Sequence, residues 1–175
     1  MKKLFALLIF FTLAVAVYGQ SASKCNCGAF VDFNYSGYIS IYDKPYGVQI
    51  GQLKNNIKDE DFLIMNIEND SLDFLYANIG FAIKESSKIK GWVKKSKAIG
   101  TYARNYSQGD TLFLYSKADT NSKISTFIPE WINNVYKIEK CYNDWVYVIT
   151  KYKGKTKKGW LQPDRQCANP YTTCN

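Results

Sequence analysis

Apolar and polar residues alternate along several short segments of this chain, with the two-residue period of half-buried β-strands. These segments are rich in tyrosine, isoleucine and valine, and turn-forming residues separate them; they are residues 39–42, 62–67, 74–77, 112–115 and 135–141. Outside the N-terminal leader, no stretch of about ten or more residues has the period of an amphipathic helix. The pattern therefore predicts an all-β protein built from short strands.

Four short motifs occur twice along the chain in the same order. The paired motifs are 39–42 with 112–115, Ile50 and Leu53 with Ile124 and Phe127, 73–76 with 144–147, and 90–93 with 158–161. Their offsets are 73, 74, 71 and 68 residues, so the spacing changes only where loops would change length. Four motifs in register predict an internal duplication into two similar units.

Each unit would contain about five short strands within roughly 65 residues, and such a sheet hides its edges best by closing. We therefore expect two small barrels in tandem, at 29–100 and 109–175, joined by the polar segment 100–109. Within the strand at 145–148, the two valines should face the interior and the two aromatic residues an outer face. The glycine before each tryptophan, at 91 and 159, should leave room for the large ring.

The first residues have the pattern of a secretory signal peptide. Lys2 and Lys3 precede an apolar run at 4–17, and small or polar residues follow. This run is shorter than the ~20 residues of a membrane-spanning helix, and no second run of that length follows. We predict a leader at 1–19, with residue 22 as the alternative cleavage position. The expected product is an exported protein, periplasmic or extracellular, without a membrane span.

The chain is moderately basic, with 23 lysine and arginine residues against 15 acidic ones and a formal net charge of +8. Loss of the two leader lysines would leave +6. Such a charge favours acidic polymers or surfaces, although scattered lysines also fit an ordinary soluble surface. The densest cluster, within 151–158, lies in a predicted turn. No basic face with interleaved aromatic residues forms a nucleic-acid module, so we expect no nucleic-acid partner.

Five cysteines fit an oxidising compartment, and their odd number leaves one thiol unpaired; they are Cys25, Cys27, Cys141, Cys167 and Cys174. Cys25 and Cys27 are too close in sequence to bridge each other comfortably, so we expect disulfides among the chain ends and Cys141. A zinc site made from the four terminal cysteines is conceivable by count. The spacing of the last two is loose for zinc, and export favours disulfides, so no metal is expected.

Three segments in order resemble the bacterial SH3 (SH3b) family of exported and cell-wall proteins. They are "LFLYSKADTNSKISTF", "NDWVYV" and "KKGWL", which correspond to an opening strand with its loop, an aromatic-aliphatic hairpin and a closing Gly-Trp-aliphatic strand. The unit at 109–175 resembles the family more closely than the unit at 29–100, which has Phe74 where tryptophan is usual and a longer loop. The tail "QCANPYTTCN" resembles the end of a Bacteroidetes subset of these proteins.

The resemblance implies a non-catalytic binding module that recognises peptide or cell-wall (peptidoglycan) material. Aromatic-lined grooves suit extended peptides because rigid rings lose little entropy, although the same rings also serve as packing residues. The candidate ligand-binding residues are Tyr42, Tyr46, Phe74, Tyr76 and Trp92 in the first unit, and Tyr115, Trp131, Trp145, Tyr147 and Trp160 in the second. The alternative is an envelope protein-protein partner, such as an inhibitor, an immunity factor or an assembly subunit.

Histidine is absent from the sequence. Its absence excludes Ser-His-Asp and Cys-His catalysis and the H-E-x-x-H metal hydrolases. A glycosidase that uses two carboxylates stays formally open, but the acidic cluster at 59–61 has the pattern of loop charges. No glycine-rich phosphate-binding loop occurs. We therefore predict no catalytic residues, no enzyme activity and no cofactor.

Overall fold

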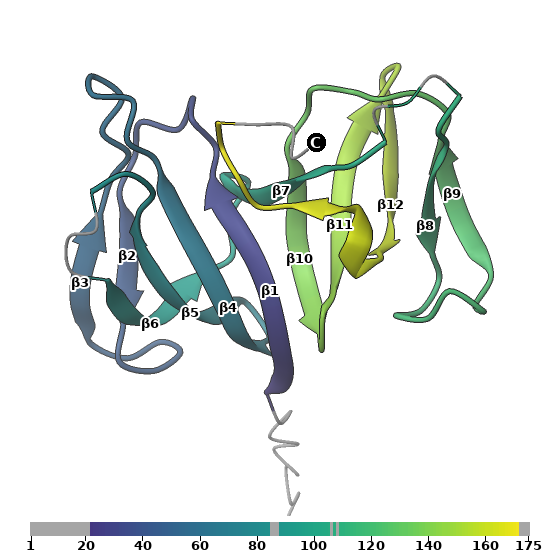
Figure 1. Cartoon of the computed structure of the whole chain (residues 1–175). Coiled ribbons are helices and arrows are strands. Elements are labelled where there is room, and N and C mark those ends of the chain that lie inside the picture. Colours follow the sequence, from purple (N-terminus) through teal and green to yellow (C-terminus); the bar gives the residue numbers. More distant parts are fainter. Residues whose placement is uncertain (1–21, 85–87, 106, 108, 172–175) are drawn as a thin grey trace, which may run out of the picture.

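The structure, a computed structural model, describes residues 22–84, 88–105, 107 and 109–171 (Figure 1). The predicted leader at 1–19 lies outside these residues. The described chain forms β1 (Ser23–Val31), β2 (Ile39–Tyr42), β3 (Gln49–Leu53), β4 (Leu63–Ser71), β5 (Phe74–Phe81), β6 (Ile89–Lys94), β7 (Ile99–Ala103), β8 (Leu112–Tyr115), β9 (Ile124–Ile128), β10 (Tyr136–Tyr142), β11 (Trp145–Tyr152), β12 (Lys155–Leu161), the short 3₁₀ helix η1 (Pro163–Arg165) and β13 (Gln166–Cys167). The all-β prediction is confirmed. Over the same residues, no helix is long and apolar enough to cross a membrane.

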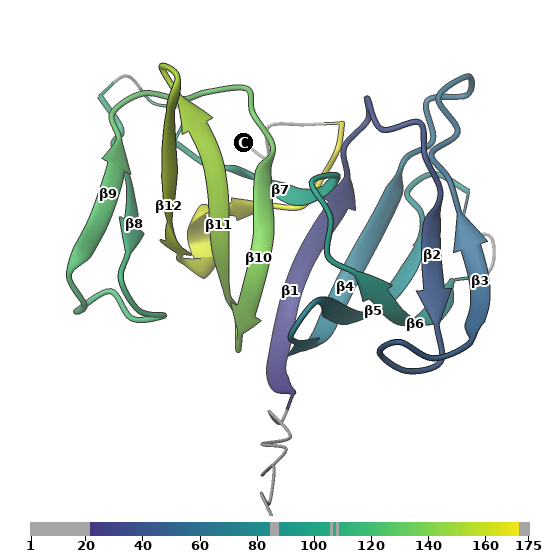
Figure 2. The same ribbon diagram turned by 180° about the vertical axis from the view of Figure 1, so that it is seen from behind.

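The strands form one continuous antiparallel path, in the order β3-β2-β6-β5-β4-β1-β7-β10-β11-β12-β8-β9, with β13 beside β7 (Figures 1 and 2). We call β1 to β6 the first half and β7 to β12 the second half. The pairing order of the second half repeats that of the first with each strand number raised by six. The two equivalent edge strands, β1 and β7, pair with each other at the centre. Strand pairing within the described chain therefore joins the halves into one sheet and does not close two separate barrels.

The segment expected to connect the two units, 100–109, is partly a strand. All five residues of β7 are buried, and this strand pairs with β1, β10 and β13. Its polar side chains are satisfied in the interior: the Thr101 hydroxyl accepts a hydrogen bond from the backbone N–H of Cys167 (3.1 Å). The sequence prediction was wrong here because a polar composition does not distinguish a loop from a strand whose partners lie far away in sequence.

Strand register corrects one of the four sequence matches. Ser40 pairs with Gln52 in the first half, and Phe113 pairs with Phe127 in the second. Gln52, not Leu53, is therefore the structural equivalent of Phe127, at an offset of 75 rather than 74 residues. A shift of one residue along a strand moves a side chain to the opposite face of the sheet. The sequence match had aligned apolar residues that face opposite sides.

The glycine before each tryptophan lies against the backbone of a neighbouring strand. A Cβ atom on Gly91 would lie 2.8 Å from the carbonyl oxygen of Tyr42, and one on Gly159 would lie 2.9 Å from that of Tyr115. Both distances are too short for any other residue without movement of the strands. The glycine is thus required by the close approach of two backbones, and not by the space needed for the ring, as the sequence had suggested.

The β4–β5 and β10–β11 hairpins turn through equivalent residues with left-handed backbone conformation. These residues are Leu72 (φ 42°) and Asn143 (φ 50°). Asparagine tolerates this conformation, whereas leucine is strained in it. At this turn, the first half therefore carries backbone strain that the second half avoids.

Replacing Leu72 by asparagine should raise the free energy of unfolding by about 1 kcal/mol, because the strain is relieved and the side chain is 62% exposed. The reciprocal change, Asn143→Leu, should lower it by a similar amount. Urea denaturation of both variants measures the two effects. Equal and small effects of the same sign would show that the turn conformation does not decide stability.

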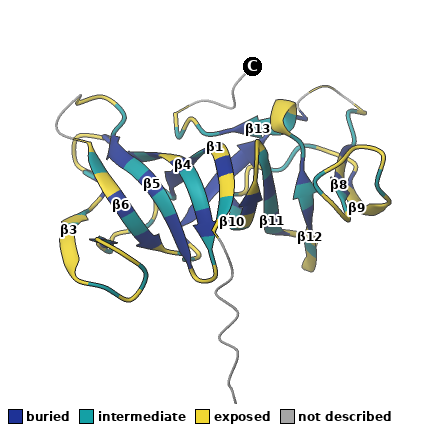
Figure 3. Ribbon diagram, turned by 90° about the horizontal axis from the view of Figure 1, so that it is seen from below, coloured by how far each residue is buried: buried dark blue, intermediate teal, exposed yellow. Residues whose placement is uncertain are grey.

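One buried apolar cluster extends through both halves (Figure 3). It contains Ile41 and Leu75 of the first half together with Leu114, Val146 and Val148 of the second, each of which is fully buried. The valines of β11 thus face the interior, as predicted. A smaller cluster made by Phe30, Tyr102 and Cys167 packs around β1 and β7. The shared core and the β1–β7 pairing hold the halves in a fixed relation.

Candidate functional site

Eight of the ten predicted site residues form two equivalent aromatic groups. We call them the first quartet, Tyr42, Phe74, Tyr76 and Trp92, and the second quartet, Tyr115, Trp145, Tyr147 and Trp160. In each quartet, the tyrosine of the opening strand contacts the first ring of the hairpin, with centroids 5.9 and 5.8 Å apart. The second hairpin ring contacts the tryptophan, at 5.2 and 5.6 Å. The same fold thus builds the same aromatic surface twice.

In the first quartet, Phe74 is buried under a neighbouring ring, whereas Tyr42, Tyr76 and Trp92 are half-buried. The Tyr46 ring packs against Phe74 at 5.0 Å, and its hydroxyl donates a 2.8 Å hydrogen bond to Asp73, which raises the pKa of Tyr46. Lys90 lies 5.5 Å from the centre of the Tyr76 ring. Phe74 is only 3% exposed as a result. Phe74 is therefore a packing residue, and Tyr46 is its exposed cover.

The second quartet is more open at one position, that of Trp145. Trp145, Tyr147 and Trp160 are all half-buried. The loop at 116–123, which corresponds to the loop that carries Tyr46, contains no aromatic residue. The two quartets therefore differ at one ring: Phe74 is buried beneath Tyr46, whereas its equivalent Trp145 is half-buried.

A cleft of about 470 Å³ lies between the two halves next to the second quartet. Trp160 contributes one side of it, together with Lys140 and Tyr142 of β10. Asp70 and Lys95 contribute the other side from the first half. The cleft therefore combines exposed ring surface with charged groups, and it depends on both halves.

Two charges in this cleft neutralise each other. The Lys95 ammonium lies 2.5 Å from one carboxylate oxygen of Asp70 and donates to the carbonyl oxygen of Leu72, also at 2.5 Å. The second carboxylate oxygen of Asp70 accepts a 2.7 Å hydrogen bond from the backbone N–H of Cys141. The side chain of Asp70 is 8% exposed and that of Lys95 is 11% exposed. Because Asp70 also accepts a hydrogen bond from β10, this buried pair links the two halves. Lys140 is exposed and has no carboxylate within ion-pair distance among the described residues.

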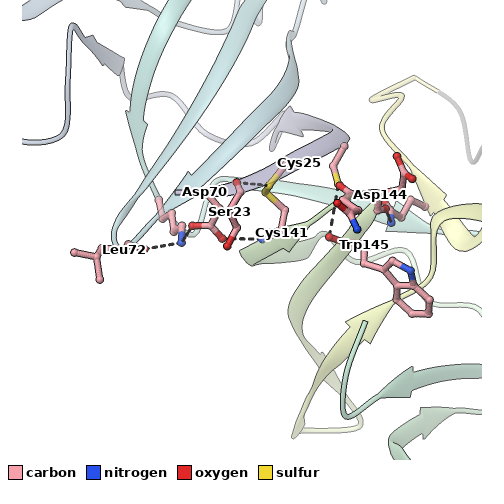
Figure 4. Close-up of a disulfide and its surroundings, with 11 residues drawn as sticks. Ser23, Cys25, Asp70, Leu72, Cys141, Asp144 and Trp145 are labelled. Atoms are coloured by element: carbon pink, nitrogen blue, oxygen red, sulfur yellow. Dashed lines mark hydrogen bonds and ion pairs between the residues drawn. A yellow bond between two sulfur atoms is a disulfide. The ribbon is translucent and has the colours of Figure 1, made fainter. Parts of the chain in front are cut away.

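A disulfide between Cys25 of β1 and Cys141 of β10 joins the two halves beside the cleft (Figure 4). Hydrogen bonds continue this contact: the backbone N–H of Asn26 donates to the carbonyl oxygen of Asn143, and the Asn143 N–H donates to that of Lys24. Covalent and backbone contacts therefore hold the two sides of the cleft in a preformed geometry.

The cysteine prediction is confirmed where the structure describes it. A cysteine near one chain end bonds to Cys141, and Cys27 is a free, buried thiol. Burial raises the pKa of Cys27 to about 12, so this thiol is poorly nucleophilic near neutral pH. The disulfide removes Cys25 from the conceivable zinc set, and no cluster of potential metal ligands is present in the described chain. Cys174 lies outside the described residues. A disulfide is compatible with an exported protein.

Two further grooves lie at equivalent positions beside the opening strand of each half. The groove beside Tyr42 has a volume of about 220 Å³, and the groove beside Tyr115 about 410 Å³. Phe113 lines the larger groove, as does Arg165, whose guanidinium lies 2.6 Å from an Asp110 carboxylate oxygen. Trp131, the remaining predicted site residue, is half-buried in the segment between β9 and β10, which lines none of these hollows.

Sequence reasoning identified the aromatic residues of the site but missed its charged ones. Asp70, Lys95 and Lys140 follow no motif. Register shows that Asp70 is the structural equivalent of Cys141, since they pair with Leu75 and Val146 at the same place in each half. The sequence gives one indication of this site: the two halves have different residue types, aspartate and cysteine, at this equivalent position.

The chain is an all-β protein made of two equivalent halves, each with an aromatic quartet. No protein-family model matches the sequence, and no curated protein matches it at a significant level. Among solved structures, the chain is similar to NlpC1 from Trichomonas vaginalis, with 12% sequence identity and a TM-score of 0.34. The match covers 88% of this chain and 50% of that chain, so this protein spans about half the length of NlpC1. At this TM-score, the similarity supports no conclusion about the activity of either half.

Proposed function

We propose that the protein is an exported binding module in which the two halves act as SH3b-like units and hold a peptide in the cleft between them. The ligand class that fits best is peptide of the cell wall, the stem peptides of peptidoglycan. The observation that carries the proposal is the position of Trp160, which belongs to the second quartet and also lines the inter-half cleft. The proposal includes removal of the leader and a periplasmic or extracellular location.

The chemistry of the cleft supports this ligand class. Half-buried rings provide flat apolar surface for an extended chain, and they lose little entropy when they bind it. Lys140 supplies a cation without a carboxylate partner among the described residues, and stem peptides carry free carboxylates. The disulfide and the Asp70–Lys95 pair fix the walls before binding, which lowers the ordering cost of association. The site binds without catalysing a reaction, in keeping with the absence of histidine.

The test measures retention of the mature chain on purified, insoluble peptidoglycan. The wild-type protein should bind saturably, and Trp160→Ala should weaken the apparent affinity about tenfold or more, the effect of losing a central aromatic anchor. Trp92→Ala is the matched control, because it removes the equivalent half-buried tryptophan of the first quartet, which does not line the cleft. It should change the affinity about twofold or less.

Circular dichroism and thermal unfolding would establish that both variants fold. A wild-type chain that washes off peptidoglycan at low salt would remove the proposal. Equal losses in the two folded variants would show that the cleft is not the binding site. Lys140→Gln should reduce binding and its dependence on salt, because it removes one charge that pairs with a ligand carboxylate.

A further inference from the structure

Because the chain contains an internal repeat, each surface residue of the β8–β9 hairpin can be compared with the equivalent residue of the β2–β3 hairpin. Phe113 and Phe127 form a cross-strand pair in the second half and are 40% and 52% exposed. The residues at the equivalent paired positions of the first half are Ser40 and Gln52. The same hairpin therefore forms with polar residues at these two positions. The two exposed phenylalanines are not needed to make the hairpin, and adjacent exposed rings form the kind of apolar surface that partner proteins cover.

A second difference between the halves places a positive charge at the same surface. The Lys157 ammonium lies 5.7 Å from the centre of the Phe127 ring and donates a 3.1 Å hydrogen bond to the Thr126 hydroxyl. Lys157 lies two residues before Gly159, and the residue two before the equivalent Gly91 is Ile89. No carboxylate of the described chain forms an ion pair with Lys157. The surface thus offers a cation beside exposed rings.

The edge of this surface is open to a further strand. β9 is the last strand of the sheet and pairs only with β8 among the described strands. An open edge exposes backbone N–H and C=O groups that an added strand can use. The groove of about 410 Å³ that Phe113 lines lies beside the same hairpin and could receive an apolar side chain.

We propose that the β8–β9 hairpin docks an extended acidic segment of a partner protein. The segment pairs as a strand with the free edge of β9, its apolar side chains lie on Phe113 and Phe127, and a carboxylate pairs with Lys157. This surface is separate from the inter-half cleft, and the inference does not depend on peptidoglycan binding.

A second copy of this chain fits the surface poorly. Two β9 edges would bring the Lys157 side chains toward each other, which is repulsive. The other open edge, β3, has the sequence QIGQL and contains no acidic residue. Charge complementarity therefore favours a different, acidic partner.

The experiment selects a display library of random 12-residue peptides on the full mature chain, with counter-selection on the Phe113→Ser/Phe127→Gln double variant. Both substituted residues come from the equivalent positions of the first half, so the variant should fold, and circular dichroism would establish this. We expect enrichment of peptides that carry Asp or Glu between alternating apolar residues. Failure to enrich any peptide over the variant, or enrichment of basic peptides, would overturn the proposal.

The most enriched peptide is then synthesised with a fluorescent label for anisotropy. The double variant should bind it at least tenfold more weakly, and Lys157→Gln should bind it more weakly with a smaller salt dependence. Trp160→Ala should bind it like the wild type, which separates this surface from the proposed cell-wall site. Unchanged binding to the double variant would contradict the assignment. Sedimentation velocity of the wild type should show a monomer, and a dimer abolished by the double variant would identify a second copy as the occupant instead.

Discussion

Replacing Cys25 and Cys141 together by alanine is expected to lower the free energy of unfolding by about 4 kcal/mol. The disulfide joins residues separated by 116 positions, so it closes a loop that contains most of the described chain. In the chain-entropy description, the stabilisation rises with the length of the closed loop, and a loop of about 100 residues corresponds to about 4.7 kcal/mol. Guanidinium denaturation of the oxidised wild type and the double variant measures the difference.

The double variant is preferable to a single one because Cys27 lies two residues from Cys25 and could bond to an unpaired Cys141. Cys27→Ala is the matched control: it removes another buried sulfur but leaves the disulfide intact. Its cost should be about 1 kcal/mol, from the loss of packed volume alone. If the two changes cost the same, the covalent link between the halves would not be a main source of stability.

Sequence periodicity located the strands whose side chains alternate and missed those whose side chains do not. The alternating segments at 39–42 and 112–115 coincide with β2 and β8. The sequence pattern did not predict β1 and β7, because several of their buried positions hold small or polar residues, such as Cys25, Cys27 and Thr101. These two strands lie about 70 residues apart in sequence and pair with each other. Local alternation cannot report a pairing of that range.

The candidate site shows the same division between local and long-range information. The outward-facing aromatic residues could be predicted because each belongs to a strand with a clear period. The cleft could not, because its charged groups come from three separate places: Asp70 from β4, Lys95 from the residue after β6, and Lys140 from β10. The pairing of β4 with β1, of β1 with β7 and of β7 with β10 brings these groups together. The different cover of the two quartets likewise depends on a loop residue, Tyr46, whose contact with Phe74 has no sequence signature.

Replacing Asp70 by alanine should lower the free energy of unfolding by about 3–5 kcal/mol. The substitution leaves the Lys95 ammonium largely buried, with its side chain 11% exposed, and without its carboxylate. It also leaves the backbone N–H of Cys141 without its acceptor at 2.7 Å. An uncompensated charge and an unsatisfied buried donor both raise the free energy of the folded state. Urea denaturation measures the change, with the disulfide kept oxidised so that the halves stay linked.

Two further variants separate the buried charge from other causes. Asp70→Ala combined with Lys95→Met should recover part of the lost stability, because no buried charge then remains, although the Cys141 N–H still lacks its partner. Asp59→Ala is the control for an exposed pair: Asp59 lies 3.3 Å from Lys84, with side chains 52% and 61% exposed, and its loss should cost far less than the loss of Asp70. If Asp70→Ala and Asp59→Ala cost the same, or if Lys95→Met adds to the damage, the buried pair does not join the two halves in the way that its geometry indicates.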